Sequence, residues 1–331
     1  MGEKSESTFT KTANVDVEGT PRQLPLLIRP VGGNVDLVQW LQENEDLATQ
    51  SLLNHGAILF RAFNVTSATY FEQVARAVCR DLLPDNAEHT PVSENGMIQT
   101  PIFYPPDRKL LWHNENSFNL KWPLRLLFCC MRPADRGGET PLVDSRRVFS
   151  RLDPSIVRQF TDLGVMYVRN FGTGLGLSWQ KVFGTGDKSH VANLCRQMNV
   201  EFEWRRDDEL HTHFVRPGVI PHPITGEMSW FNQAQHWHIA CGDEEMREAL
   251  LEMFPEDQLP RMCYYGDGSS IDSSVMKEIM DVYQELEVSF AWEKSDVAIL
   301  DNVLIAHARN PFQGERRLLV AMGEMQSFGH K

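Results

Sequence analysis

The sequence predicts a mainly β fold with flanking helices, of the α+β class. From about residue 96 onward, short strand-like segments outnumber helical ones. Residues 125–131 form a continuous apolar run, which is typical of a strand buried on both faces. Helical spacing of apolar residues is clearest before residue 84, so the helices there are expected to pack on the outside of a sheet.

The first part of the chain predicts a leader followed by helix, strand and helix. Residues 1–22 are polar and rich in Gly, Ser and Thr, which favours a flexible leader ahead of a single domain over 23–331. Apolar residues at helical spacing predict a helix from Asn34, placed as its cap, to Asn54. A strand is expected over 57–63, and Thr66 or Ser67 opens a second helix that reaches about Leu83.

Further strands are expected over 97–103, 125–131 and 140–144, with a turn at Gly137-Gly138 and a helix starting near Ser145. Residues 154–200 are interpreted as an insertion with helices at 154–163 and 187–199 and a strand at 165–170. The glycine-rich run 172–177 lacks the spacing of a phosphate-binding loop, so it predicts a mobile loop or lid. The remaining elements are strands at 200–204, 212–216, 228–232, 288–301 and 317–322, and helices at 243–254 and 273–286.

Composition narrows the class of protein. The 331 residues carry a net charge of −13 with a pI near 5.3, which argues against a nucleic-acid partner because phosphates need a basic surface. No apolar run reaches transmembrane length, and the N-terminus lacks the apolar core of a secretory signal. The six cysteines form no CxxC pair, which favours a reducing compartment. A soluble cytoplasmic protein is expected, and the sequence does not decide whether it forms a homo-oligomer.

Residues 112–117 carry the main functional motif. His113 and Glu115 are two positions apart, so on a strand or at its rim both side chains project to one face. An imidazole and a carboxylate presented together can fill two neighbouring positions on a divalent ion. With His307 they would complete a face of two histidines and one carboxylate, the ligand set of non-haem Fe(II) oxygenases.

A second metal hypothesis is weaker. His236 and His238 form a His-x-His pair, followed by Asp243 and Glu244, in a pattern loosely like a cupin site. No arginine accompanies this pair, so a structural or pocket-lining role is expected for His238.

An arginine pair follows the distal histidine. Arg316 and Arg317 open the apolar strand 317–322, and a desolvated guanidinium at the mouth of a barrel requires an anionic partner. A small dicarboxylate fits, because one end can chelate iron while the far carboxylate meets the arginine bidentately. Thr140, after the Gly137-Gly138 turn, can donate a hydroxyl hydrogen bond to that same carboxylate.

Several motifs together carry a family resemblance. The sequence resembles the taurine-dioxygenase (TauD/TfdA) superfamily of Fe(II)/2-oxoglutarate dioxygenases in His113-x-Glu115, Gly137-Gly138-Glu139-Thr140, Asp301-Asn302, His307-Ala308-Arg309 and Pro311-Phe312-x-Gly314-x-Arg316-Arg317. It is similar to the branch of syringomycin-type amino-acid hydroxylases of natural-product biosynthesis in Trp230-Phe231-Asn232-Gln233, Tyr265-Gly266-Asp267-Gly268 and Val168-Arg169-Asn170-Phe171-Gly172. The likeness covers nearly the whole chain past residue 25.

The resemblance implies a double-stranded β-helix (jelly-roll) barrel with helical insertions that uses Fe(II), 2-oxoglutarate and O2. It makes His113, Glu115 and His307 the catalytic iron ligands. It assigns the distal 2-oxoglutarate carboxylate to Thr140 and Arg317, with Arg316 the less favoured of the arginine pair.

Two features of the sequence limit the substrate and the reaction. Taurine dioxygenase has a sulfonate-binding arginine four residues further on, where this chain has Ala321, so taurine is not expected as the substrate. Glu115 argues against a halogenase, in which a small residue replaces the carboxylate.

The expected reaction is hydroxylation of an unactivated C–H bond of an amino acid, free or presented by a carrier protein. Residues expected to line the substrate cavity are Asn114, Asn116, Ser117, Arg169, Trp230, Asn232 and Gln233. Desaturation or cyclisation with the same cofactors remains an alternative. A non-catalytic binding module on the same barrel is the alternative from another class.

Overall fold

The computed structural model describes residues 10–12, 15–18, 23–33, 35–83 and 90–328. The chain divides into two compact units, each with its own sheets and core. Unit 1 comprises the described residues up to Glu115, Lys121–Ser145 and the part from Glu287 onward. Unit 2 comprises Asn116–Leu120 and Arg146–Leu286. The single domain expected over 23–331 stays a prediction.

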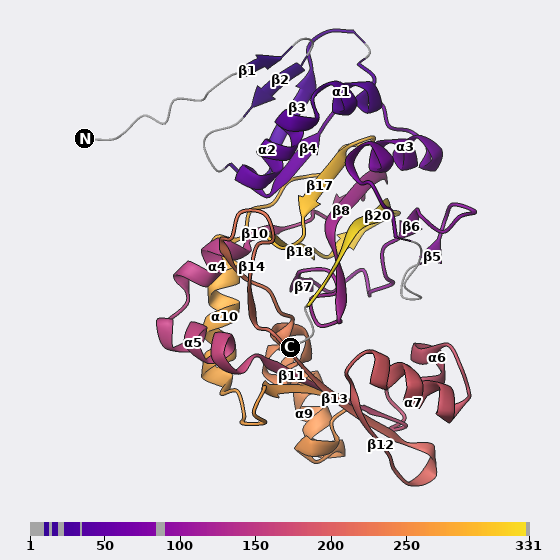
Figure 1. Cartoon of the computed structure of the whole chain (residues 1–331), viewed down its shortest axis with the longest axis vertical. Helices are drawn as coiled ribbons and strands as arrows, with labels where there is room; N and C mark the ends of the chain where they lie inside the picture. Colours follow the sequence, from indigo (N-terminus) through magenta and orange to yellow (C-terminus); the bar gives the residue numbers. More distant parts are fainter. Residues whose placement is uncertain (1–9, 13–14, 19–22, 34, 84–89, 329–331) are drawn as a thin grey trace. The chain divides into compact units, whose positions relative to one another are not determined.

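Unit 1 is built on a large mixed sheet, which has nine strands within the described residues (Figure 1). Neighbouring strands are antiparallel except β3 and β4, which run parallel. In spatial order the strands are β1 (Thr10–Thr12), β2 (Val15–Glu18), β3 (Leu26–Pro30), β4 (Ala57–Phe60), β17 (Val297–Asp301), β8 (Lys121–Arg132), β20 (Arg317–Ser327), β6 (Gln99–Thr100) and β5 (Thr90–Pro91).

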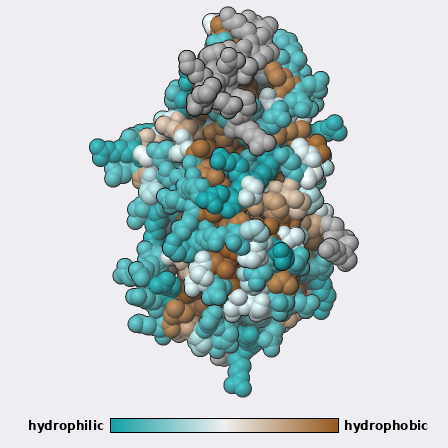
Figure 2. Space-filling model, turned by 90° about the vertical axis from the view of Figure 1, so that its left-hand side faces the viewer, coloured by the Kyte–Doolittle hydropathy of each residue, from teal (hydrophilic) through white to brown (hydrophobic). Residues whose placement is uncertain are grey.

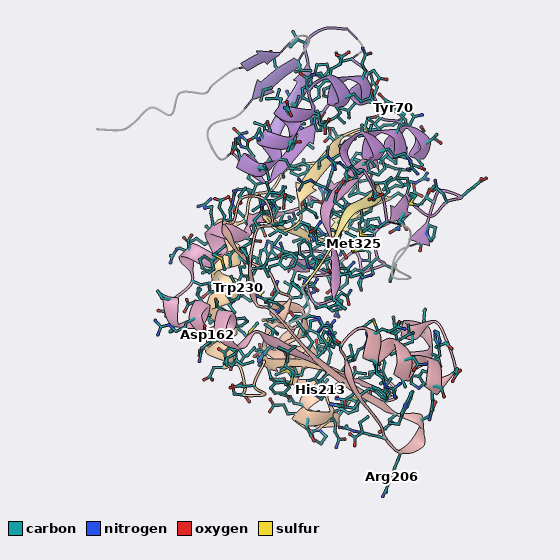
Figure 3. The ribbon with its side chains drawn as sticks, viewed as in Figure 1. Tyr70, Asp162, Arg206, His213, Trp230 and Met325 are labelled. Carbon is teal, nitrogen blue, oxygen red and sulfur yellow. The ribbon has the colours of Figure 1, made fainter. Side chains whose placement is uncertain are left out.

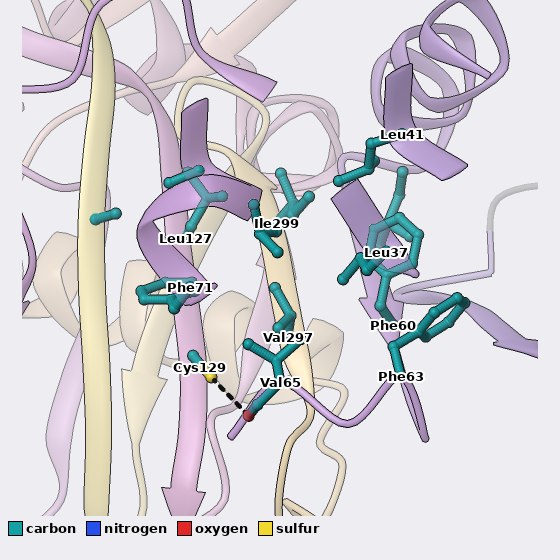
Figure 4. Packing of buried hydrophobic residues seen from close by; sticks show 14 of the residues in the cluster. Leu37, Leu41, Phe60, Phe63, Val65, Phe71, Leu127, Cys129, Val297 and Ile299 are labelled. Carbon is teal, nitrogen blue, oxygen red and sulfur yellow. Dashed lines mark hydrogen bonds between the residues drawn. The ribbon is translucent and has the colours of Figure 1, made fainter. Parts of the chain in front are cut away.

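The central strands send alternate side chains into two separate cores. Leu127 and Cys129 of β8 pack on one face with Val297 and Ile299 of β17, and the Cys129 thiol lies 3.8 Å from the carbonyl oxygen of Val65 (Figure 4). The intervening residues of β8 pack on the other face, in a cluster that contains Leu126, Phe128, Cys130, Ala298, Leu300, Leu318 and Val320. The predicted two-sided burial of 125–131 is therefore confirmed.

Three helices cover the first face, as expected: α1 (Leu37–Glu43), α2 (Glu45–His55) and α3 (Ala68–Val78). The single helix expected over 34–54 is wrong, because the chain breaks at Asn44 between α1 and α2. The carboxylate of Asp36 caps α1 by accepting a hydrogen bond from the amide of Gln39 at 2.8 Å. The expected cap, Asn34, lies outside the described residues.

A smaller sheet packs on the second face and completes the sandwich. It has three strands in the described residues, in the order β10 (Leu142–Asp144), β18 (Ile305–Arg309) and β7 (Leu110–His113). Leu142, Leu304 and Ile305 contribute to the cluster that holds Leu126 and Phe128 of the large sheet. A short pair, β9 (Arg136–Gly137) with β19 (Phe312–Gln313), lies beside the Gly137-Gly138 turn. Two sheets facing each other over an apolar layer give the predicted jelly-roll class.

Three expected segments of unit 1 need correction. The strand expected over 97–103 is limited to Gln99–Thr100, because prolines at 101, 105 and 106 cannot donate to a ladder. The strand expected from 288 begins only at Val297. Within the expected flexible leader, β1 and β2 pair with each other and β2 pairs with β3, and Val15 is fully buried. The alternation of apolar and acidic residues over 15–18 was the signal for this strand.

Unit 2 is built on its own antiparallel sheet, with four strands in the described residues: β12 (Glu201–Trp204), β13 (Leu210–Arg216), β11 (Val165–Phe171) and β16 (Arg261–Tyr265). A separate pair is formed by β14 (Val219–Pro221) and β15 (Met228–Trp230). The helices of this part of the chain are α4 (Ser145–Arg151), α5 (Pro154–Leu163), α6 (Trp179–Phe183), α7 (Lys188–Gln197), α8 (Ala234–Trp237), α9 (Glu244–Met253) and α10 (Ser273–Leu286), with 3₁₀ turns η1 (Arg206–Asp208), η2 (Ile239–Cys241) and η3 (Glu256–Gln258).

The expected helices at 154–163 and 273–286 are confirmed at both ends. Asp153 caps α5 and Pro154 occupies its first turn, while Gly164 ends it with a φ of 73°. The expected insertion at 154–200 is only a part of unit 2, because β11 pairs with β13 and β16 beyond residue 200. Residues 172–178 form no helix or strand, and their role as a lid stays a prediction.

The exposed surface agrees with the composition. On the face drawn in Figure 2, hydrophilic residues predominate and hydrophobic ones occur in several patches between them. None of the helices in the described part of the chain combines the length and the apolar character needed to span a bilayer.

Candidate metal centre and adjoining cavity

The pairing of β7 with β18 brings two histidines together. The strands run antiparallel, with His113 and His307 as Cα partners, and the centroids of their imidazole rings lie 4.2 Å apart. The register shifts between His307 and Arg309, which is a bulge at this end of the pair. Backbone hydrogen bonding in a sheet therefore fixes the separation of two side chains that are far apart in sequence.

Glu115 follows β7 in a turn and completes the group. Its Oε2 lies 3.9 Å from Nε2 of His113 and 4.0 Å from Nε2 of His307. One ligand atom from each of the three residues lies within 4.8 Å of the others. Within the described residues, no second group of three His, Cys, Asp or Glu side chains is as close together.

The spacing and chemistry of these donors fit a bound divalent ion. The two nitrogen–oxygen separations are too long for hydrogen bonds, yet donors that each lie about 2.1 Å from one ion can be up to about 4.2 Å apart. Nδ1 of His113 lies 2.9 Å from the carbonyl oxygen of Leu111 and donates to it. This bond places the ring proton on Nδ1, so Nε2, which faces Glu115, is the basic nitrogen.

Asn302 holds the segment that carries Glu115. Its side-chain oxygen accepts from the amide of Glu115 at 2.6 Å, and its side-chain nitrogen donates to the carbonyls of Glu115 at 2.9 Å and Pro123 at 2.8 Å. Asn302 is fully buried. Because it belongs to the turn that leads into β18, one amide ties the carboxylate segment to the strand of His307. The sequence showed Asn302 as part of a motif but gave no hint of this role.

Asp301 shapes the same turn. Its Oδ1 accepts from the backbone amides of Val303 at 3.0 Å and Leu304 at 3.2 Å, and its Oδ2 forms a buried ion pair with Arg125 of β8. Both members of the pair are less than a tenth exposed, so removing either one would leave a buried charge without its partner.

A cavity of about 350 Å³ adjoins His307 in unit 1. Its volume falls in the range of small-molecule sites. Its walls include Thr140, whose hydroxyl oxygen accepts from the indole Nε1 of Trp292 at 3.0 Å and retains its own proton to donate. The other residues that line it are Thr100, Pro101, Ile102, Phe103, Tyr104, Pro106, Leu110, Phe128, His307, Ala308, Arg309, Phe312, Gly314, Arg316, Arg317 and Leu318.

The two residues of the arginine pair differ in their burial. Arg317 is exposed, whereas Arg316 is partly buried and its Nε donates to the carbonyl of Gly138 at 2.9 Å. Burial lowers the pKa of Arg316 to about 10, so its guanidinium remains charged at neutral pH. Within the described residues, no carboxylate lies in salt-bridge contact with Arg316. Both arginines line the cavity, so the assignment of the 2-oxoglutarate carboxylate to one of them stays a prediction, and the partial burial of Arg316 favours Arg316.

Gly138 makes room for this arginine. Its φ is +75°, and a Cβ built there would lie 3.0 Å from Cδ and 3.1 Å from Nε of Arg316. Both the left-handed backbone and the close approach favour glycine at this position.

Two of the expected substrate residues hydrogen-bond to neighbouring groups of the protein. The side-chain amide of Asn114 donates to the carbonyl of Asn302 at 2.7 Å and to the hydroxyl of Ser145 at 3.2 Å, and Asn114 is fully buried. Asn232 donates to the carbonyl of Gly218 at 2.8 Å and accepts from the amide of Ala234 at 3.0 Å. These amides hold turns, and contact of Asn114 or Asn232 with a substrate stays a prediction.

The other expected substrate residues lie in unit 2. Trp230 is buried among the side chains of this unit against Phe160, whereas Arg206 projects away from it (Figure 3). The Arg169 guanidinium lies 4.5 Å from the ring centroid of Phe171. Asn116, Ser117 and Gln233 are buried, and their contact with a substrate stays a prediction.

The alternative metal pair is not assembled as a site. His238 is buried, with Nε2 3.0 Å from the carbonyl oxygen of Ile271 and Nδ1 accepting from the amide of Ala240 at 3.2 Å. Both ring nitrogens therefore serve local structure, as expected for His238.

The model of the family "Taurine catabolism dioxygenase TauD, TfdA family" matches residues 21–322. The chain belongs to this family. The predicted TauD/TfdA resemblance is thereby confirmed, and so is the enzyme class, a dioxygenase that depends on iron and 2-oxoglutarate.

Two relatives and a solved structure agree with this TauD-family assignment. The chain is 35% identical over 272 residues to the dapdiamide synthesis protein DdaC of Enterobacter agglomerans, covering 82% of this chain and 83% of DdaC. It is 26% identical over 322 residues to a clavaminate synthase-like protein of Arabidopsis thaliana, covering 91% and 94%. The structure of PvcB from Pseudomonas aeruginosa superposes with a TM-score of 0.55 at 12% identity, covering 96% of this chain and 94% of PvcB. This last likeness confirms the fold class.

Proposed function

We propose that this TauD-family oxygenase binds Fe(II) through His113, Glu115 and His307 and the distal carboxylate of 2-oxoglutarate through Thr140 and Arg316. The observation that carries the proposal is the juxtaposition of a three-donor group with a cavity that contains a partly buried guanidinium. The donors lie within 4.8 Å of one another, and His307 belongs both to the group and to the cavity wall.

Each residue has a distinct task in this site. When bound, iron and 2-oxoglutarate together activate O2, so that an unactivated C–H bond can be broken. His113 and His307 are fixed by strand pairing, and Glu115 is fixed by Asn302. Arg316 neutralises the far carboxylate, and the Thr140 hydroxyl donates to it. Phe128 and Leu318 give the cavity an apolar wall that excludes water.

The favoured substrate is an amino acid, and the favoured reaction is its hydroxylation. Support comes from the similarity to DdaC, a protein of dapdiamide synthesis, which also favours a role in natural-product biosynthesis. Taurine is a disfavoured substrate whichever arginine binds 2-oxoglutarate. The sulfonate-binding arginine of taurine dioxygenase would lie four positions further on, and this chain has Val320 four positions after Arg316 and Ala321 four positions after Arg317. The favoured candidates for substrate contacts are Asn116, Ser117, Arg169, Trp230 and Gln233, since the side-chain amides of Asn114 and Asn232 already bond to neighbouring groups.

The substrate proposal is tested by a screen for coupled turnover. Free amino acids and carrier-bound aminoacyl groups are incubated with the iron-loaded protein, 2-oxoglutarate and O2. A substrate should give succinate together with a product that has gained one oxygen atom. A mass loss of two hydrogens would support desaturation or cyclisation instead. Succinate release at the same rate with and without every amino acid would reject this substrate class.

A cytoplasmic location and a carrier-protein partner are parts of the same proposal. All six cysteines are free thiols, which is typical of a reducing compartment. Size-exclusion chromatography with light scattering, with and without a loaded carrier protein, would test the partner and report any homo-oligomer. Absence of a mass increase with every carrier tried would count against the carrier.

A further inference from the structure

Arg309 binds the backbone of a neighbouring loop rather than an acid. Its NH1 donates to the carbonyl of Tyr104 at 3.0 Å, and its NH2 donates to the carbonyls of Pro105 at 2.6 Å and Arg108 at 2.5 Å. Within the described residues it forms no salt bridge. One guanidinium therefore holds the carbonyl groups of three residues of this loop, because its planar fork presents several donors at once.

Two aromatic rings flank the same guanidinium. Its carbon lies 5.4 Å from the ring centroid of Tyr104 and 5.1 Å from that of Phe312. The amide of Phe312 also donates to the carbonyl of Pro106 at 2.8 Å, so the segment after β18 meets the loop at a second point. These contacts hold the side chain in one orientation, since cation–π and hydrogen-bond geometry both constrain its plane.

The loop held in this way is a wall of the cavity next to His307. Pro101, Ile102, Phe103, Tyr104 and Pro106 all line the cavity, yet this stretch has almost no strand pairing of its own. Phe103 is 87% exposed and Ile102 is 45% exposed, so apolar burial contributes little to holding the loop in place. Three hydrogen bonds from Arg309 tie residues 104–108 to β18.

We infer that Arg309 is a positioning residue that clamps the loop 101–108 as the wall of the 2-oxoglutarate cavity, two positions after the histidine His307. This inference rests on the proposed function, because it takes the cavity to be the co-substrate site. Without the clamp the wall would open, and the co-substrate would lose its packing while the three metal-binding side chains kept theirs.

The clamp depends on the fork of the guanidinium and not on charge alone. A lysine at this position keeps the positive charge but offers a single nitrogen, which cannot reach the carbonyls of Tyr104, Pro105 and Arg108 together. Arg309→Lys and Arg309→Gln are therefore expected to behave alike. If the charge were what mattered, Lys would preserve function and Gln would not.

The first measurement needs no ligand. Hydrogen exchange of the apo protein is followed by mass spectrometry for peptides that cover 101–111, in wild type and in Arg309→Lys, Arg309→Gln and Arg132→Gln. Arg132 is a matched surface arginine whose side chain is 56% exposed in its ion pair with Glu315. Both Arg309 variants should exchange faster in these peptides, while Arg132→Gln should match wild type. Unchanged exchange in both Arg309 variants would overturn the clamp.

The second measurement is anaerobic titration of the Fe(II)-loaded proteins with 2-oxoglutarate. Both Arg309 variants should bind the co-substrate about tenfold more weakly, which corresponds to about 1.4 kcal/mol, with iron affinity within twofold of wild type. Wild-type affinity in Arg309→Lys alone would overturn the clamp in favour of a charge effect. If wild type itself bound no 2-oxoglutarate, the proposed function would be wrong, and the exchange data would decide separately whether Arg309 holds the loop.

Discussion

His113 of β7 and His307 of β18 are direct Cα partners, and their imidazole rings lie 4.2 Å apart between centroids. Two of the three donors of the candidate metal centre are therefore positioned by sheet hydrogen bonding, which is more rigid than a loop. The third, Glu115, follows β7 within two residues, so it moves with the same strand. A site built in this way is largely formed before any ion binds.

Removal of a donor should abolish the metal site without unfolding the protein. In His113→Ala and His307→Ala, two donors remain, and we expect Fe(II) affinity to fall by at least about 100-fold. Neither variant should then develop the weak visible charge-transfer band of an iron–2-oxoglutarate complex under anaerobic conditions. His190→Ala, in which an exposed histidine of α7 is removed, is the matched control and should give the wild-type band. A normal band in His113→Ala would show that the ion binds elsewhere.

Asn302 should affect the same ion without touching it. Replacement by Ala removes three hydrogen bonds to the backbone of Glu115 and Pro123 and leaves those groups buried, at a cost of roughly 3 kcal/mol in the free energy of unfolding. We expect a lower Tm and also a weaker Fe(II) affinity, by about tenfold, because Glu115 is no longer held beside the histidines. Asn193→Ala, at an exposed position of helix α7, is the control. A lower Tm with unchanged iron affinity would reduce Asn302 to a purely structural residue.

The sequence predicted the three-donor group, since His-x-Glu spacing and a distal histidine are local features that strand geometry converts directly into proximity. The sequence could not decide which of Arg316 and Arg317 binds 2-oxoglutarate, because adjacent residues of an extended chain point to opposite sides. The pairing of β20 with β8 also shifts register between Arg317 and Leu318, directly after the arginine pair.

Several of the missed features depend on partners that are distant in sequence. The side-chain amides of Asn114 and Asn232 were expected to contact the substrate. In the structure they donate to backbone carbonyl groups, and those partners are set by turns that only the folded chain defines. The same is true of Arg309, which the sequence showed beside a metal ligand with no visible acceptor. The break at Asn44 was missed because apolar spacing continues through it.

The two adjacent arginines should differ sharply when each is replaced. Arg316→Gln removes the partly buried guanidinium in the cavity, and we expect the KM for 2-oxoglutarate to rise about 100-fold. Arg317→Gln changes an exposed side chain and should alter it by less than about threefold. Glutamine is chosen because it keeps polar contacts while losing the charge. The reverse order of effects would make Arg317, which also lines the cavity, the anchor of the co-substrate.

We expect the stability of unit 2 to depend on pH through His238, and this dependence can be measured separately from catalysis. Burial lowers the pKa of His238 below its ordinary value near 6.5, although its contact with the Ile271 carbonyl and the charge of Glu256 oppose this. The unfolded chain therefore binds the proton more readily than the folded one. The stability that the neutral ring contributes is complete above about pH 6.5 and is lost as the pH falls below it, with a slope of at most about 1.4 kcal/mol per pH unit.

Thermal unfolding at pH 7.5 and 5.5 tests this linkage. Asn at position 238 can still accept from the amide of Ala240 but does not titrate, so His238→Asn should have a lower Tm at pH 7.5 and a smaller drop in Tm on acidification than wild type. Some drop should remain, because burial, together with Arg205 and His213, also lowers the pKa of His211. His190→Gln, with an exposed histidine, should keep the wild-type drop. If His238→Asn lost as much stability on acidification as wild type, protonation of this ring would not be what weakens the fold.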